Sequence, residues 1–330
     1  MKTTIVITSI FPPTEAVKKF GEGKSEELIV VGDKKSPLEW NCPRARFLNV
    51  EEQEKSGFHL TKTLPYNHYS RKMTGYLTAI RNGATSIIDA DDDNIPFDDW
   101  GFPLMDGTFD TIDENKGFIN IYNLFTDQKI WPRGFPLRKI NDEKEGKAHI
   151  EKKHSSIGVW QGLADEDPDV DAIYRLTDGR ECFFQQRQPV VLGKGTLSPF
   201  NTQNTLIRKE LFPLMYLPAF VTFRYTDILR GLIAQPIMWL YGFNLGFTSS
   251  TVVQKRNPHD YFKDFLSEIP MYETAEKVVE TVSCVISEKH TPSENLLLAY
   301  QKLLDINVVT ENEIVLLKDW IEDLKQLGIE

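Results

Sequence analysis

The sequence predicts an α/β protein with a mostly parallel central sheet and a helical C-terminal extension. Over residues 1–90, short runs rich in β-branched residues alternate with helix-type patterns, and such alternation is typical of a parallel sheet. From residue 260 onward, the apolar residues recur at helical spacing. We therefore expect a sheet-containing domain at residues 1–262 and a helical extension at residues 263–330 that packs on it.

The elements of the N-terminal half follow from their apolar residues. Thr4–Ile10 is expected to be a buried strand, and the helix Thr14–Phe20 begins after two prolines with Thr14 as its N-cap. The next expected elements are the strands Leu28–Val31 and Arg46–Val50, the helix Ser70–Asn82 and the strand Ser86–Ile88. In sheets of this kind, ligands bind at the carboxyl ends of the strands.

The second half has a looser pattern until apolar residues return at Leu211–Phe247. We expect a strand at Ile119–Asn123 and a core helix and strand within Leu232–Phe247, which is interrupted by polar residues and is too short for a membrane span of about 20 apolar residues. The expected C-terminal helices are Ala275–Ser287, Ser293–Leu304 and Glu311–Leu327, the last with a capping box of Thr310 and Glu313.

Composition narrows the classes of function. The 330 residues include 48 acidic and 38 basic side chains, for a net charge of −10. A protein that binds a nucleic-acid polymer normally carries a basic patch and a high isoelectric point, so we exclude that partner. The three cysteines have no CxxC spacing and suit a reducing compartment. With no transmembrane segment in the sequence, we expect a cytoplasmic protein.

Four carboxylates follow the short apolar strand: Asp89, Asp91, Asp92 and Asp93. Strand alternation would send Asp89, Asp91 and Asp93 to one side, where like charges repel by about 1 kcal/mol per pair even in water. A divalent cation relieves this repulsion, and it is typically held by one or two carboxylates and substrate phosphates. We predict Mn²⁺ or Mg²⁺ on Asp91 and Asp93, with a solvated acidic turn as the alternative.

Other phosphate and metal motifs do not fit. An EF-hand that begins at Asp89 would have Asn94 in place of the required Gly and Trp100 in place of the required Glu. The sequence also lacks a P-loop, a complete dinucleotide fingerprint, HExxH and GxSxG. A DxD motif at the end of a strand in a nucleotide-binding sheet points instead to a GT-A glycosyltransferase fold, which is Rossmann-like.

Several segments, in the same order, resemble one family over residues 3–265. They are Val6–Ile10, Pro13–Val17, Arg71–Leu77, Asp91–Asn94, Trp131–Leu137, Asp167–Leu176 and Gln254–His259. This pattern resembles the STELLO-type glycosyltransferases and, more distantly, the plant reversibly glycosylated polypeptides, which are UDP-arabinopyranose mutases. The resemblance implies a metal-dependent transferase that uses a UDP-sugar donor and a carbohydrate or glycan acceptor. STELLO proteins also carry a Golgi membrane anchor, which this sequence lacks, so we expect a free catalytic domain.

The mutase resemblance supplies the alternative function. In that family, an arginine in a segment similar to Arg133–Arg138 is implicated in self-glycosylation, and Arg133 matches its position. The segment is two residues shorter here, and its second arginine has shifted register. The alternative is therefore a nucleotide-sugar mutase that is transiently glycosylated on Arg133. A third hypothesis is a catalytically silent nucleotide-sugar-binding or scaffold protein. The intact acidic cluster argues against it, because a silent site has no need to retain the repulsion between these carboxylates.

The same comparison suggests roles for further residues. As catalytic residues besides Arg133 we expect Asp227, the base of an inverting transfer kept ionised by Arg224, and Asp171, which would hold sugar hydroxyls and is favoured over Asp169. His259 is a candidate third metal ligand. The candidate donor-binding residues are Thr8, Ser9, Asp33, Arg71, Lys72, Asp92, Arg224 and Lys255. Each of three residues also has a purely structural alternative. Asp33 would be a turn residue, Asp227 a helix cap and His259 an exposed side chain.

Overall fold

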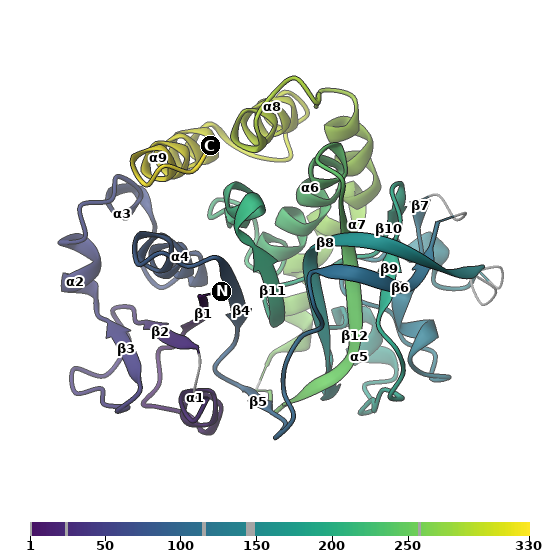
Figure 1. Cartoon of the computed structure of the whole chain (residues 1–330), viewed down its shortest axis with the longest axis horizontal. Helices are drawn as coiled ribbons and strands as arrows, with labels where there is room; N and C mark the ends of the chain where they lie inside the picture. The colour runs from purple at the N-terminus through teal and green to yellow at the C-terminus, as the bar shows by residue number, and fades with distance from the viewer. Residues whose placement is uncertain (1, 24–25, 114–116, 143–148, 257–258) are drawn as a thin grey trace.

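A mixed sheet of ten strands runs through the described part of the chain, in the order β3-β2-β1-β4-β11-β8-β6-β9-β12-β5 (Figure 1). The computed structural model describes residues 2–23, 26–113, 117–142, 149–256 and 259–330. The strands of this sheet are β1 (Thr3–Thr8), β2 (Glu27–Val31), β3 (Ala45–Leu48), β4 (Ser86–Ala90), β5 (Asn94–Pro96), β6 (Asp106–Ile112), β8 (Ile150–Glu166), β9 (Val190–Leu192), β11 (Asn204–Arg208) and β12 (Phe243–Gln254). A separate pair joins β7 (Gly117–Phe118) to β10 (Thr196–Leu197).

The first four strands in the spatial order, β3, β2, β1 and β4, are parallel. Strand β11 is antiparallel to both β4 and β8, and the rest of the sheet mixes the two directions. A parallel, Rossmann-like half therefore continues into a mixed half. This arrangement confirms the predicted α/β class.

Helices cover the sheet on both faces. They are α1 (Glu15–Gly21), α2 (Val50–Glu54), α3 (Leu60–Thr63), α4 (Lys72–Arg81), α5 (Ala172–Thr177), α6 (Thr226–Leu240), α7 (Tyr261–Ser283), α8 (Pro292–Asp305) and α9 (Glu311–Gln326). Short 3₁₀ helices occur at η1 (Tyr69–Arg71), η2 (Ile121–Leu124), η3 (Leu137–Lys139) and η5 (Lys209–Met215). The expected core helix and strand within Leu232–Phe247 are the end of α6 and the start of β12.

Strand alternation divides the apolar residues of β1 and β2 between two cores. Val6 joins α4 and the C-terminal helices in the larger core, whereas Ile5 and Ile7 join α1 in the smaller one. Figure 1 shows α4 and α1 on opposite sides of these strands. Helix α4 packs closely because of Gly75, where a Cβ atom would lie 2.5 Å from the Cγ1 atom of Val6. This packing places the start of α4 beside the ends of β1 and β4.

Two local predictions were wrong. The strand expected at Ile119–Asn123 is the 3₁₀ helix η2, because the Asn120 side chain accepts a hydrogen bond from the Tyr122 amide and caps the turn. Thr310 makes no side-chain capping bond at the start of α9, within the part of the chain that the structure describes. The Glu313 carboxylate instead accepts hydrogen bonds from the amides of Ala219 and Phe220.

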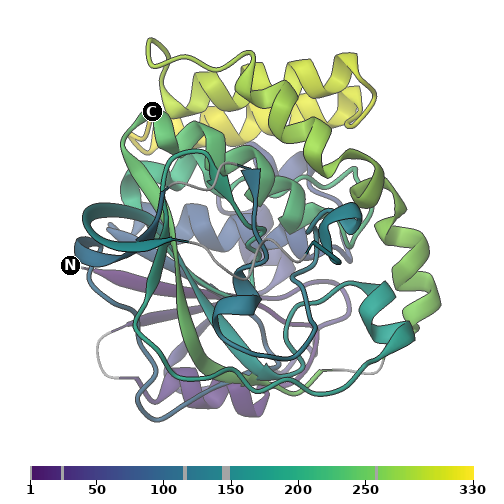
Figure 2. The same ribbon diagram turned by 90° about the vertical axis from the view of Figure 1, so that its right-hand side faces the viewer.

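The C-terminal helices lie together along one side of the molecule in both ribbon views (Figures 1 and 2). The expected division between residues 262 and 263 falls inside α7, and the buried Trp320 of α9 belongs to the larger core with Leu60 of α3. The side chain of Asp323 accepts hydrogen bonds from the amides of His59 and Leu60. None of the helices in the described ranges combines the length and the apolar character that a membrane span requires.

Candidate active site

A cleft of about 320 Å³ lies at the carboxyl ends of β1, β2 and β4. Its other walls come from residues 67–71, before α4, and from the start of α6. Most of the residues expected from the sequence line this cleft: Thr8, Ser9, Asp33, Arg71, Asp91, Asp92, Asp93, Arg133, Arg224 and Asp227. Residues from distant parts of the chain therefore meet at the strand ends, as the parallel sheet predicts.

Asp89, the first carboxylate of the acidic cluster, anchors the floor below the cleft. It is fully buried, and its Oδ1 atom lies 2.8 Å from Lys72 Nζ. Its Oδ2 atom accepts hydrogen bonds from Arg230 Nη1 at 2.8 Å and from the Tyr76 hydroxyl at 2.6 Å. These partners compensate the buried charge of Asp89.

Lys72 does not lie where the sequence suggested. Its side chain is fully buried, and Nζ donates to Asp89, to the Ala90 carbonyl and to Asp91 Oδ1, the last at 3.0 Å. Although burial alone would lower the pKa of Lys72, the carboxylates of Asp89 and Asp91 raise it above its usual value. Lys72 thus neutralises the acidic cluster from below instead of reaching a diphosphate.

Asp91, Asp92 and Asp93 follow β4 in a turn, so strand alternation ends at Ala90. Asp92 accepts a hydrogen bond of 2.5 Å from the Ser9 hydroxyl, which ties the turn to the end of β1. The Oδ2 atom of Asp93 lies 3.3 Å from Gln254 Nε2. Its Oδ1 atom is buried and lacks a hydrogen-bond partner among the described residues. An oxygen in this state is available to a ligand.

The three carboxyl groups resist ionisation. Burial raises the pKa of Asp91 to about 7, with Asp93 and Asp89 adding to the rise and Lys72 opposing it. Burial raises the pKa of Asp92 to about 6, against the Ser9 hydrogen bond, and that of Asp93 to about 6, with help from Asp92. A divalent cation would compensate this charge and favour the ionised forms.

Polar groups with unused hydrogen-bonding capacity lie on the wall of the cleft that is formed by residues 67–71. Arg71 is almost fully buried, and its Nε atom donates to Gln53 Oε1 at 2.8 Å. Its Nη2 atom and His68 Nε2 are both buried without a partner in the described part of the molecule. Burial lowers the pKa of His68 to about 4, against the attraction of Asp33, so the ring is neutral at pH 7.

Aromatic rings extend this wall. The His68 and Tyr69 rings are stacked, with centroids 5.4 Å apart, and Phe223 packs edge-on against both of them. Phe223 lines the cleft and is 52% exposed. Asp33 accepts a hydrogen bond of 3.2 Å from the His68 amide and thereby fixes this segment beside the end of β2. The wall therefore combines flat apolar surface with polar atoms.

Arg133 lies between two buried carboxylates. Its Nε and Nη2 atoms donate to Asp169, each at 2.8 Å, and its Nη1 and Nη2 atoms donate to Asp227 at 3.0 and 2.9 Å. Nη1 also donates to the carbonyl of Arg224. Against the effect of burial, the two carboxylates hold the pKa of Arg133 well above its usual value. Every nitrogen of this guanidinium is therefore engaged.

Asp227 keeps one hydrogen-bonding position open. A carboxylate has about four lone-pair positions, and those of Asp227 accept hydrogen bonds from two nitrogens of Arg133 and from the Tyr69 hydroxyl, the last at 3.2 Å. The remaining position is on Oδ2, and the residue lines the cleft. The helix-cap alternative is wrong, because Asp227 lies in the first turn of α6 and Tyr225 is the N-cap.

The partner expected for Asp227 was also wrong. Arg224 lines the cleft but donates through Nε to Glu268 Oε1 at 2.9 Å, and Arg133 takes its place beside Asp227.

Asp171, expected to hold sugar hydroxyls, does not line the cleft. It is fully buried, caps α5 by accepting from the Tyr174 amide at 2.9 Å, and accepts from Trp131 Nε1 at 2.7 Å. It is a structural helix cap, whereas Asp169 supports the cleft through Arg133.

Lys255 and His259 lie beside a second cavity of about 490 Å³. Lys255 pairs with Glu166, and His259 Nδ1 lies 3.1 Å from Asp264 Oδ2. The intervening Asn257 and Pro258, part of the family-like segment, are outside the described residues. His259 therefore does not join Asp91 and Asp93. Among the described residues, no three His, Cys, Asp or Glu side chains are placed to hold a metal ion together.

The sequence does not predict four residues of this site. They are His68, Tyr69 and Phe223 on the aromatic wall and Asp169, which holds Arg133. The His-Tyr pair shortly before Arg71 is a signal for the wall, and the acidic run around Asp169 is a signal that favours Asp171 equally well. Phe223 has no such signal, because its role depends on packing against His68 and Tyr69, which are distant in the chain.

Comparisons with known proteins agree with the family resemblance. A family model described as STELLO glycosyltransferases matches residues 224–330. Two curated proteins of Arabidopsis thaliana, the probable glycosyltransferases STELLO1 and STELLO2, are 25% and 26% identical to the chain over 98% of its length. The predicted similarity to STELLO-type glycosyltransferases is thus confirmed. The chain spans less than half of the length of these relatives, 44% and 45%.

Among solved structures, one match is the glucosyl-3-phosphoglycerate synthase of Mycobacterium tuberculosis in complex with phosphoglyceric acid. It is 11% identical, the match covers 87% of this chain and 81% of the synthase, and the TM-score is 0.38.

Proposed function

We propose that this chain, which is similar to STELLO-type glycosyltransferases, transfers a sugar from a UDP-sugar to a carbohydrate or glycan acceptor with the help of a divalent cation. The observation that carries this proposal is the composition of one cleft. It holds the free carboxylate oxygen of Asp93, the aromatic wall with unpartnered polar atoms, and the available position on Asp227. These are groups suited to a diphosphate-bound cation, a nucleoside and an acceptor hydroxyl.

The donor would lie along the cleft. Phe223 offers a face for the uracil ring, while His68 Nε2 and Asp33 lie where they can bind polar atoms of the nucleoside. Asp91 and Asp93 would hold Mn²⁺ or Mg²⁺, with diphosphate oxygens and water as the other ligands, because the described residues supply two carboxylates and not three. The cation would stabilise the negative charge that develops on the departing diphosphate.

The chain's own residues would then direct an inverting transfer. The acceptor hydroxyl donates a hydrogen bond to Asp227 Oδ2, and its oxygen attacks the anomeric carbon while the bond from that carbon to the UDP oxygen breaks. Asp227 takes the proton of the hydroxyl. Arg133 orients the carboxylate by donating to both of its oxygens, at 3.0 and 2.9 Å.

The contacts of Arg133 argue against the mutase alternative. A glycosylated arginine must first offer a nitrogen lone pair, and the two carboxylates that raise the pKa of Arg133 stabilise its protonated form. Attachment of a sugar would also break hydrogen bonds to Asp169 or Asp227. We therefore assign Arg133 a positioning role.

Calorimetric titration with UDP, in the presence and absence of Mn²⁺, tests the proposal. The wild-type protein is expected to bind UDP with Mn²⁺ and at least tenfold more weakly without it, and Asp93→Ala is expected to lose the Mn²⁺-dependent part with the fold intact. Asp98→Ala is the matched control, since Asp98 is an exposed acidic residue nearby. Unchanged affinity in Asp93→Ala would sink the assignment.

A further inference from the structure

The second cavity contains two arginines with unused hydrogen-bond donors. Arg175 and Arg256 both line it, and their side chains are only 5% and 8% exposed. The Nε atom of each is buried without a hydrogen-bond partner within the described ranges. Buried polar groups in folded proteins are nearly always paired, so two buried, unpaired donors on residues that line one cavity point to a ligand that completes the site.

The charges around Arg256 favour an anion as that ligand. Its closest carboxylate oxygen, Asp264 Oδ2, lies 3.9 Å away and already contacts His259. The other cations that line the cavity have nearer partners: Arg175 pairs with Asp167, Lys255 with Glu166 and Arg180 with Asp178. Burial, together with the positive charges of Arg175 and Arg224, lowers the pKa of Arg256 to about 10, although the carboxylates of Asp167 and Asp169 oppose this shift. An oxyanion beside Arg256 would offset this unfavourable burial of positive charge.

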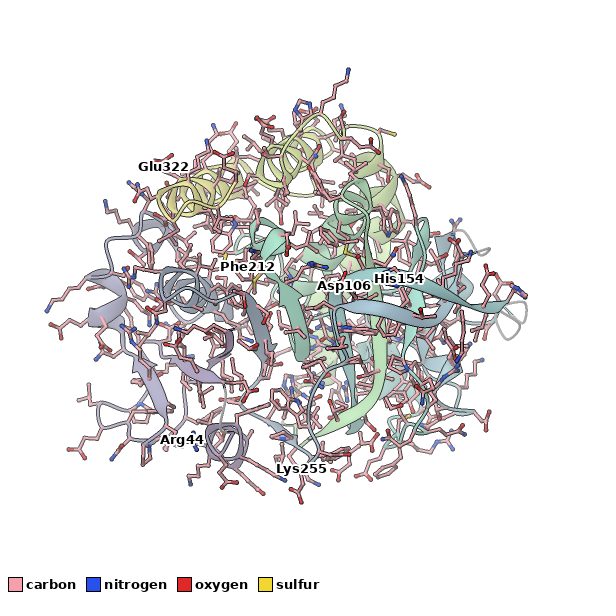
Figure 3. All side chains as sticks on the ribbon, in the orientation of Figure 1. Arg44, Asp106, His154, Phe212, Lys255 and Glu322 are labelled. Atoms are coloured by element: carbon pink, nitrogen blue, oxygen red, sulfur yellow. The ribbon has the colours of Figure 1, made fainter. Side chains whose placement is uncertain are left out.

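The second cavity borders the cleft. Gln254 lines the second cavity, and its Nε2 atom lies 3.3 Å from Asp93 Oδ2 in the cleft. The amide of Lys255 donates to the carbonyl of Asp93 at 2.9 Å. On the other side, Arg224 of the cleft donates through Nη2 to the carbonyl of Val170, which lines the second cavity. Figure 3 labels Lys255 at the end of β12, next to the β5 edge of the sheet.

We propose that the second cavity is an oxyanion-binding subsite, built around Arg256 and Arg175, that holds a phosphate or carboxylate group of the acceptor. The anion site rests on the cavity itself, whereas its assignment to the acceptor rests on the proposed transfer reaction. The subsite makes anionic acceptors the preferred class, since an acceptor anchored beside Asp93 can present a hydroxyl to the neighbouring cleft.

Thermal-shift titrations of the full chain with inorganic phosphate and, separately, acetate test the anion site, because a ligand of the folded state raises the melting temperature. Phosphate or acetate is expected to stabilise the wild-type protein, and Arg256→Gln is expected to weaken its apparent affinity about tenfold. Arg138→Gln removes an exposed arginine and should leave the affinity unchanged. The proposal fails if neither anion binds, or if Arg138→Gln weakens the affinity as much as Arg256→Gln.

Two further measurements keep the result interpretable. Arg256→Lys retains the positive charge and is expected to bind more tightly than Arg256→Gln, which excludes a purely structural effect of losing the guanidinium. Mn²⁺-dependent UDP binding should be unchanged in Arg256→Gln. If the wild-type protein binds the anion through Arg256 but binds no UDP, the proposed function fails and the anion site stands. If sugar phosphates are no better acceptors than the parent neutral sugars, the acceptor assignment fails.

Discussion

Asp227 is the residue on which the proposed chemistry depends most directly. Its carboxylate is held by Arg133 and Tyr69 and keeps one lone-pair position toward the cleft. Asp227→Asn keeps the size of the side chain but removes its ability to take up a proton. We expect this change to lower kcat about 10²- to 10⁴-fold, with little change in UDP affinity.

Asp171→Asn is the matched control for that measurement. Asp171 is also a buried aspartate, but it caps α5 and lies outside the cleft. Its substitution should lower the free energy of unfolding by about 1 kcal/mol and leave kcat of the folded protein unchanged. Steady-state kinetics together with urea unfolding separates the catalytic role of Asp227 from the structural role of Asp171. A catalytic defect in Asp171→Asn but not in Asp227→Asn would contradict both assignments.

The acidic turn predicts an unusual dependence of stability on pH. Because the pKa values of Asp92 and Asp93 are about 6 and that of Asp91 is about 7, the folded protein binds more protons than the unfolded chain between about pH 4 and 7. These groups therefore make the metal-free protein less stable as the pH rises through that window. Urea unfolding with a chelator present measures the effect.

Asp93→Asn provides the corresponding variant. The amide cannot ionise, so the metal-free variant should be more stable than the wild-type protein at pH 8, by on the order of 1–2 kcal/mol, while losing Mn²⁺ binding. Asp98→Asn, in an exposed position, should change neither property. A destabilised metal-free Asp93→Asn protein would contradict the proposed cost of these partly buried carboxylates.

At the residue scale, local patterns predicted the parts of the site that lie at strand ends. Asp91, Asp92, Asp93 and Ser9 follow β-strands, and topology alone brings such residues together. The ion pair of Arg133 with Asp227 could not be predicted in this way, because it joins residues far apart in the chain. Reasoning from the sequence favours neighbours in the chain, so it predicts Arg224, only three residues away, as the partner of Asp227 in place of Arg133.

At the scale of elements, α9 is tied to the cleft through Glu313. Its carboxylate accepts hydrogen bonds from the amides of Ala219 and Phe220 and from the Tyr216 hydroxyl, just before the segment that carries Phe223. Burial raises the pKa of Glu313, whereas these donors favour its ionised form. This contact also explains the missing capping box, because a carboxylate engaged by the 219–220 loop does not return to its own helix.

Glu313→Gln tests this connection. The amide side chain has one acceptor oxygen in place of two, so a buried donor loses its partner and we expect a loss of about 1–3 kcal/mol in the free energy of unfolding. The apparent KM for the donor should also rise, because the loop positions Phe223. Glu311→Gln is the control on the exposed first turn of α9. Equal stability of the two variants would argue against the anchor.

Elements with strong periodicity were predicted closely, including β1, β2, α4 and α8. The failures are instructive because each has a local competitor. Ile119–Asn123 has strand-type residues, but Asn120 caps a 3₁₀ turn in their place. Helix α7 begins at Tyr261, well before the expected Ala275. The Asp260 side chain caps it by accepting hydrogen bonds from the amides of Phe262 and Lys263, and the helix tolerates Pro270 in its interior.

At the scale of the whole molecule, the C-terminal helices share one core with the sheet. Trp320 is fully buried and donates through Nε1 to the Pro213 carbonyl at 3.0 Å, and Leu316 and Leu324 are also fully buried. Each such side chain contributes about 1.5–3 kcal/mol when it is removed from water. The helices thus behave as part of the catalytic body more than as a detachable appendage.

Removal of residues 291–330, which form α8 and α9, is therefore expected to prevent cooperative folding. The truncated chain would expose the apolar faces of η5, α3 and α6, and it should give little soluble protein and weak near-ultraviolet circular dichroism. Removal of only residues 328–330, past the end of α9, is the control and should leave the signal intact. A truncated chain that melts cooperatively and binds UDP would contradict the shared core.

We propose that the cleft holds a divalent cation and a nucleoside diphosphate on the acidic turn. Diffraction from crystals grown with Mn²⁺ and UDP, recorded at the manganese absorption edge, would locate both ligands. We expect an anomalous peak coordinated by Asp91, Asp93 and the diphosphate, with the uracil beside Phe223. Manganese bound elsewhere, or UDP outside this cleft, would refute the proposed site.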